Sequence, residues 1–161
     1  MKRIKLVYNP ISGDGGFRNE LDLVIKTFQE RDYMVEILRT SEKPIEEDFI
    51  KESIDFFAKT IIVVAGGDGT VSQVINIMLK NNVNVPLGII PMGTANDLAS
   101  YLGMTRNIEE CCNIIMDNHQ IKMDAGKIND NYFVSVASGG LVATVPQATD
   151  VKLKNTLGKL A

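Results

Sequence analysis

One acidic residue stands between glycines in the segment GGDGT, which runs from Gly66 to Thr70. The preceding residues, 60–65, are almost continuously apolar, as expected of a buried parallel strand, and residues 70–80 have the spacing of a helix. Glycines at the carboxyl end of a parallel strand let the backbone approach a phosphate, and the following helix N-terminus favours negative charge. A bare carboxylate beside phosphates would repel them, so Asp68 makes chemical sense if a cation such as Mg²⁺ lies between. The alternative is a tight turn in which Asp68 only caps the helix.

A second glycine-containing loop, NPISGDGG, begins at Asn9 directly after a short apolar stretch. Asn9, Ser12 and Gly13 offer side-chain and backbone donors that could wrap the phosphates of a nucleotide. The loop lacks the G-K-[ST] ending of a Walker loop, so the usual lysine contact is missing. Asp14 follows Gly13, and the nearest basic residue in sequence is Arg18. Phosphate binding must therefore rely on backbone N–H groups or on a basic residue from elsewhere.

A third loop, PMGTANDLA, begins at Pro91 and follows another apolar stretch. Gly93 permits close approach, Thr94 offers a hydroxyl, and Asn96 and Asp97 are suited to capping the next helix. Three such loops at one edge of a sheet form a phosphate and metal site more readily than three independent turns.

Strands and helices alternate through the first part of the chain, which predicts an open, mostly parallel Rossmann-like α/β sheet with helices on both faces. The predicted strands are residues 4–9, 33–40, 60–65 and 86–91, and the predicted helices are residues 19–32, 45–59, 70–80, 96–102 and 108–117.

After about Asn118 the sequence pattern changes to consecutive strands, which is typical of an antiparallel sheet. Strands are predicted over 121–128 and 132–136, separated by the polar turn from Asn129 to Asn131. We therefore expect an α/β domain over 1–118 and the incomplete start of a β-rich second domain over 119–161. An unfinished sheet leaves an open edge, so the segment after about Ser138, including an amphipathic helix over 149–161, is expected to be poorly ordered or packed against a second copy in a homodimer.

The composition narrows the functional classes. The chain has 161 residues, 45% of them hydrophobic and 23% charged, and a net charge of −3, which gives no broad basic surface for nucleic acid. No apolar run is long enough to span a bilayer, and the apolar start breaks at Pro10, so we expect a cytoplasmic protein. Cys111 and Cys112 are adjacent, which suits neither a structural disulfide nor a zinc pair.

The motifs NPISG, GGDGT and GTANDLA, in this order and spacing, resemble the catalytic domain of the diacylglycerol kinase family, which includes bacterial soluble lipid kinases and is related to sphingosine and ceramide kinases. The similarity continues through KMDAGKINDNYFVSVASGG and LKNTLGKLA, so it covers essentially the whole chain. GGDGT alone is less specific, because NAD kinases carry a similar motif. The resemblance implies an ATP-dependent kinase that phosphorylates the primary hydroxyl of diacylglycerol or a related lipid at the membrane surface, giving phosphatidic acid.

The resemblance also implies roles for particular residues. Asp68 would be the Mg²⁺-linked acid, and Asp97 and Asp124 would build a charge network around that metal, which makes these three acids the catalytic candidates. The lipid-side domain would be a β-sandwich, and the general base would lie beyond Ala161, so the isolated chain is expected to be inactive. The nucleotide-binding residues implied are Asn9, Ser12, Gly13, Thr40, Gly66, Gly67, Gly69 and Thr94.

Three alternatives stay open. A non-catalytic nucleotide-binding or regulatory module would keep the nucleotide loops and bind ATP without turnover. A kinase for a soluble nucleotide such as NAD would share the GGDGT motif. An oxidoreductase on a similar sheet is disfavoured, because the G-x-G-x-x-G fingerprint is missing after the first strand.

Overall fold

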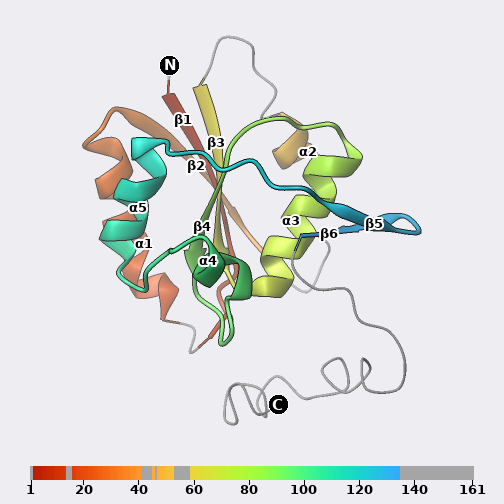
Figure 1. Ribbon diagram of the computed structural model, residues 1–161. Coiled ribbons are helices and arrows are strands. Elements are labelled where there is room, and N and C mark those ends of the chain that lie inside the picture. The colour runs from red at the N-terminus through yellow and green to blue at the C-terminus, as the bar shows by residue number, and fades with distance from the viewer. Residues whose placement is uncertain (1, 14–15, 41–44, 46, 53–58, 135–161) are drawn as a thin grey trace.

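A four-stranded parallel sheet, in the order β2-β1-β3-β4, forms the centre of the protein in this computed structural model (Figure 1). The structure describes residues 2–13, 16–40, 45, 47–52 and 59–134. The sheet strands are β1 (Lys2–Tyr8), β2 (Tyr33–Arg39), β3 (Lys59–Gly66) and β4 (Leu87–Pro91). The helices are α1 (Phe17–Gln29), α2 (Glu47–Lys51), α3 (Asp68–Lys80), α4 (Asp97–Tyr101) and α5 (Ile108–Asp117), and a small antiparallel hairpin consists of β5 (Gly126–Ile128) and β6 (Asn131–Phe133).

Helices cover both faces of the sheet, which confirms the predicted fold class. One hydrophobic cluster joins α1 and α5 to one face, and a second joins α2 and α3 to the other face (Figure 1). Seven of the eight residues of β3 are buried, which explains the continuous apolar run there. At Gly88 in β4 an added Cβ would lie 2.8 Å from Ile115 Cγ1, so this glycine lets α5 approach the sheet closely.

The second face also buries a charged residue, Lys5 of β1, which is 1% exposed. Its ammonium group donates to the backbone oxygen of Phe49 at 2.8 Å and lies 3.4 Å from Glu36 Oε2 and 3.7 Å from Glu52 Oε2. A buried ammonium group requires hydrogen-bond acceptors and opposite charges, and the backbone oxygen and the two carboxylates supply them. Lys5 therefore ties α2 to the sheet.

The order of the strands creates a switch point between β1 and β3. The chain moves from β1 through α1 to the edge strand β2, and then returns past β1 to β3. Consequently the helices that follow β1 and β3 pack on opposite faces. The crevice outside the carboxyl ends of two such strands is where open α/β sheets bind ligands.

The hairpin packs on α3 through the side chain of Asn76. Its Nδ2 donates to the backbone oxygen of Tyr132 at 2.8 Å, and its Oδ1 accepts from the backbone N–H of Tyr132 at 2.7 Å. The strand predicted over 121–128 is shorter than expected, because only β5 pairs with β6 and residues 121–125 are exposed without strand pairing. The expectations for Ser138 and for the helix over 149–161 lie outside the described residues.

Candidate functional site

The loops after β1, β3 and β4 contact one another at the carboxyl edge of the sheet. The backbone N–H of Gly67 donates to Ser12 Oγ at 3.3 Å, which joins the first loop to the second. An added Cβ on Gly93 would lie 2.5 Å from Gly67 Cα, and one on Gly13, where φ is 60°, would overlap the backbone oxygen of Met92. These glycines are needed because three backbones meet where no side chain fits.

Asp68 joins the second loop to the third. Its Oδ2 accepts from the backbone N–H of Asn96 at 2.8 Å, and its Oδ1 accepts from the backbone N–H of Asp97 at 2.8 Å. Gly67 is the N-cap residue of α3 and Asp68 lies inside the first turn, so the Asp68 carboxylate does not cap its own helix. The alternative in which Asp68 serves only as a helix cap is therefore wrong.

Asn96 closes the third loop on itself. Its Nδ2 donates to the backbone oxygen of Gly93 at 2.6 Å, and its Oδ1 accepts from the Gly93 N–H at 2.7 Å. Asn96 is buried and adopts a left-handed conformation with φ 55°, which asparagine tolerates better than most residues. It stands at the N-cap position of α4 but makes no side-chain cap, so its predicted capping role is wrong. The same holds for Asp97, which is the first residue inside α4.

The N-terminus of α3 offers unused donors. The N–H groups of Thr70 and Val71 donate to the backbone oxygen of Gly67, at 3.0 and 3.1 Å. Among the described residues, the N–H groups of Asp68 and Gly69 have no acceptor, as is usual for the first turn of a helix. An added Cβ on Gly69 would meet nothing within 4 Å. Free donors and open space at a helix N-terminus fit the phosphate groups of a nucleotide.

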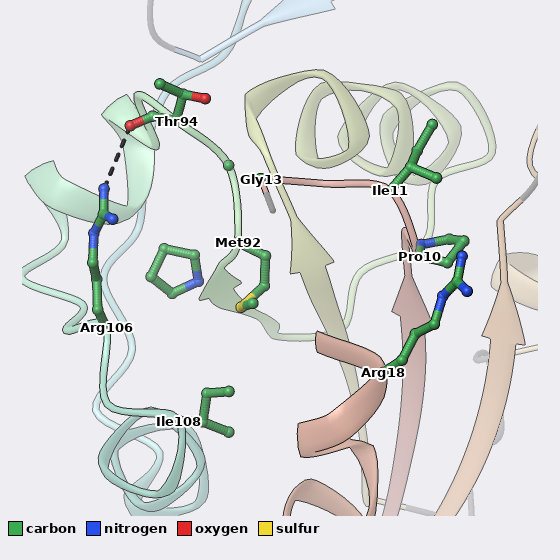
Figure 2. A pocket seen from close by; sticks show the side chains of 10 residues that line it. Pro10, Ile11, Gly13, Arg18, Met92, Thr94, Arg106 and Ile108 are labelled. Atoms are coloured by element: carbon green, nitrogen blue, oxygen red, sulfur yellow. Dashed lines mark hydrogen bonds between the residues drawn. The ribbon is translucent and has the colours of Figure 1, made fainter. Parts of the chain in front are cut away.

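A pocket of about 780 Å³ opens between the first and third loops (Figure 2). Its size lies within the range of about 300–1,000 Å³ that is typical of small-molecule sites. Two of the predicted nucleotide-binding residues, Gly13 and Thr94, line it. The other lining residues are Pro10, Ile11, Arg18, Pro91, Met92, Gly93, Arg106 and Ile108.

The remaining predicted nucleotide residues lie around the same sheet edge. Asn9 donates through Nδ2 to Thr70 Oγ1 at 3.3 Å and accepts the N–H of Ile11 through Oδ1 at 3.0 Å. Thr40 follows β2, is buried, and donates its backbone N–H to the Tyr8 oxygen at 2.9 Å. The structure thus places the ends of β1, β2 and β3 together, although nucleotide binding by these residues stays a prediction.

The predicted acids are only partly brought together. Asp97 follows Asn96 directly and exposes its side chain, whereas Asp124 lies on the exposed segment between α5 and β5. Within the described ranges, no hydrogen bond or ion pair joins Asp124 to Asp68, and no group of three or more His, Cys, Asp or Glu residues could hold a metal ion. Magnesium commonly needs only one or two carboxylates, with waters and phosphates as its other ligands, so Asp68 suits such an ion. The metal and charge-network roles stay predictions.

Sequence reasoning missed Arg106. This residue stands in the connection between α4 and α5, where no local motif marks it. The fold brings it back to the third loop, and its Nη2 donates to the backbone oxygen of Thr94 at 3.5 Å (Figure 2). The sequence pointed to such a residue only indirectly. The first loop lacks the lysine of a Walker loop, so a basic residue from another part of the chain was one way to bind phosphate.

Comparison with known proteins agrees with this arrangement. Residues 3–128 match the family model described as the diacylglycerol kinase catalytic domain. A protein named diacylglycerol kinase from Staphylococcus carnosus (strain TM300) is 31% identical over 99% of this chain and 52% of its own length. One of the same name from Staphylococcus aureus (strain bovine RF122 / ET3-1) is 33% identical over 99% of this chain and 50% of its own length.

Solved structures give the same relationship. A crystal structure of a diacylglycerol kinase from Bacillus anthracis (strain Sterne) superimposes with a TM-score of 0.69 and 30% identity, over 81% of this chain and 45% of that one. The chain spans about half the length of the curated relatives it matches.

Proposed function

The chain belongs to the diacylglycerol kinase catalytic domain family, and on that premise we propose that it is the nucleotide-binding part of an ATP-dependent lipid kinase. The proposed reaction transfers the γ-phosphate of ATP to the primary hydroxyl of diacylglycerol or a related lipid, giving phosphatidic acid. The contact of three glycine-containing loops at the switch point of the sheet is the observation that carries this proposal.

The nucleotide would lie against the loops after β1, β3 and β4. The free N–H groups of Asp68 and Gly69 would donate to phosphate oxygens, with Ser12, Gly13 and Thr94 beside them. A magnesium ion bound with ATP would be held through Asp68 and would neutralise charge on the phosphates. Catalysis of phosphoryl transfer is mostly positioning and charge stabilisation, so rigid, mutually bonded loops serve it directly.

The domain division into 1–118 and 119–161 is part of the proposal. Residues 119–161 would begin the lipid-side domain, and the lipid would reach the transferring phosphate at the membrane surface with the protein bound peripherally. No helix in the described ranges has the length and apolar character needed to cross a membrane. None of the described residues is assigned as the general base.

Binding and turnover can be tested separately on the 161-residue chain. Calorimetry with ATP and Mg²⁺ should show weak binding, whereas transfer of radiolabelled phosphate to diacylglycerol should be undetectable without the expected base. Robust formation of phosphatidic acid by the isolated chain would place the base within these residues, and Asp97 and Asp124 would be the first to substitute. A chain that does not bind ATP would contradict the proposed function.

A nucleotide-binding module without lipid turnover is the second candidate. It would use the same contacts between the three loops to bind ATP. An assay of the protein encoded by the complete reading frame distinguishes the two candidates. A lipid kinase would phosphorylate lipid, whereas a binding module would bind ATP without turnover. Titration with NAD in parallel tests a soluble nucleotide as substrate.

A further inference from the structure

We propose that Arg106, together with Arg18, binds the phosphate groups of the nucleotide in the pocket between the first and third loops. This inference rests on the proposed function, because it identifies basic residues for the same nucleotide. It supplies the positive charge that the loop after β1 lacks, since Asp14 directly follows Gly13.

The two arginines belong to different elements that line one pocket. Arg18 lies in the first turn of α1, and Arg106 lies two residues before α5. Figure 2 shows the two side chains on opposite sides of the pocket, with Arg106 directed toward Thr94 and the Arg18 guanidinium group beside Pro10. Gly13 and Thr94, which the sequence independently indicates as nucleotide-binding residues, line the same pocket. A polyphosphate that spans the pocket past Gly13 and Thr94 would therefore have a guanidinium group at each end.

The described lining of the pocket is basic in an acidic protein. Within the part of the chain that the structure describes, the lining includes two arginines and no acid, whereas the chain as a whole has a net charge of −3. Among the described residues, neither Arg18 nor Arg106 forms an ion pair with a carboxylate. A guanidinium group presents a planar set of donors that matches phosphate oxygens, often in pairs. Two such groups without carboxylate partners are suited to a polyphosphate.

The backbone around Arg106 is well anchored. The N–H of Met104 donates to the Ala99 oxygen at 2.9 Å, which ends α4. Asn107 caps α5 by accepting the N–H of Glu110 through Oδ1 at 3.0 Å. Arg106 thus projects from a fixed point. Its side chain makes one hydrogen bond within the described residues, to the Thr94 oxygen at 3.5 Å, which is at the limit of the distance range and easily exchanged for a phosphate.

The test compares three single substitutions in the 161-residue chain: Arg106→Gln, Arg18→Gln and, as a control, Arg31→Gln. Arg31 is an exposed arginine paired with Asp117 at 2.8 Å, and it precedes β2 at the opposite edge of the sheet. Each protein is titrated by calorimetry with ATP, adenosine and inorganic tripolyphosphate, and thermal unfolding confirms that each variant is folded.

We expect each pocket substitution to weaken ATP and tripolyphosphate binding about tenfold, the effect of one charge-assisted hydrogen bond to phosphate. Adenosine binding should change less than about twofold, because adenosine has no phosphate, and Arg31→Gln should bind all three ligands like the unchanged chain.

Unchanged ATP affinity in Arg106→Gln, with Arg31→Gln as reference, would overturn the role of Arg106. Equal losses for ATP and adenosine would also overturn it, because a general disturbance of the site would then be responsible. A third outcome separates the two proposals: the unchanged chain binds tripolyphosphate but not ATP, and Arg106→Gln loses the tripolyphosphate binding. This result would support the anion-binding role of Arg106 and contradict the proposed nucleotide function. If the unchanged chain binds neither ATP nor tripolyphosphate, both the arginine site and the proposed nucleotide function are contradicted.

Discussion

The Asp68 carboxylate accepts a hydrogen bond from the backbone N–H of Asp97 at 2.8 Å, although the two residues are 29 positions apart. The second oxygen of the same carboxylate takes the N–H of Asn96. One side chain therefore holds the start of α4 against the start of α3, and it fixes the loop that carries Thr94. Asp68 therefore has a structural role that is independent of any role toward a metal.

Replacing Asp68 by Ala should leave the fold intact but lower the free energy of unfolding by about 1–3 kcal/mol, because two N–H groups lose a charged acceptor. Urea denaturation measures the loss, and hydrogen exchange should be faster at the amides of Asn96 and Asp97. Asp97→Ala, at an exposed side chain, is the control and should change stability by less than about 0.5 kcal/mol. In a protein that also carries a complete lipid-side domain, we expect Asp68→Ala to abolish Mg²⁺-dependent catalysis. Near-normal lipid kinase activity there would contradict the metal role.

Two glycines of the site should respond in opposite ways to alanine. Gly93→Ala places a Cβ 2.5 Å from Gly67 Cα and 2.8 Å from Asn96 Oδ1, so the loops must separate, and we expect a loss of about 1–3 kcal/mol. Gly69→Ala meets nothing within 4 Å, and alanine in α3 should raise the thermal midpoint slightly. If Gly69 lies against phosphates, the same Gly69→Ala change should weaken ATP binding. Equal stability of the two variants would refute the close contact of the loops.

Asn76→Ala should release the hairpin from α3, because one amide supplies both hydrogen bonds to the Tyr132 backbone. Hydrogen exchange over residues 126–133 should become faster, while the amides of β1 and β3 should be unaffected. Gln73→Ala on the exposed side of the same helix is the matched control. Unchanged protection of the hairpin in Asn76→Ala would mean that other contacts, such as Lys80 Nζ to Asn131 Oδ1 at 3.0 Å, suffice.

Burial raises the pKa of the Cys112 thiol from 9.0 to about 12, with smaller contributions from Cys111 and Glu109. The folded protein therefore retains this proton above pH 9 while the unfolded chain releases it, so stability should fall as the pH rises from about 9 toward 12. Urea midpoints measured at several pH values should decline more in the unchanged chain than in Cys112→Ala. Parallel declines would show that Cys112 does not contribute. At pH 8 both thiols should react with iodoacetamide only when the chain unfolds, since both are buried.

Much of the fold was predictable because the strands of the parallel sheet and the helices that cover it have strong local sequence patterns. The apolar run of β3 and the spacing of apolar residues in α1 and α5 predicted elements that the structure confirms within a few residues. The hairpin was less predictable: residues 121–125 are rich in apolar side chains but stay exposed in the described chain, because no neighbouring strand pairs with them there. Local propensity alone does not create a strand without a partner.

The sequence by itself determined where chemistry could occur, since glycines and acids after apolar strands mark the carboxyl edge of a parallel sheet. Only the tertiary structure decided how those loops use their residues. It assigned the Asp68 carboxylate to two N–H groups of the third loop, turned the Asn96 amide back to Gly93, and brought Arg106 to the pocket. Asp68 and the third loop are separated in sequence by α3 and β4. The return of Asn96 to Gly93 depends on the left-handed backbone conformation of Asn96. The partners in these contacts are chosen by packing in three dimensions, which no spacing along the chain specifies.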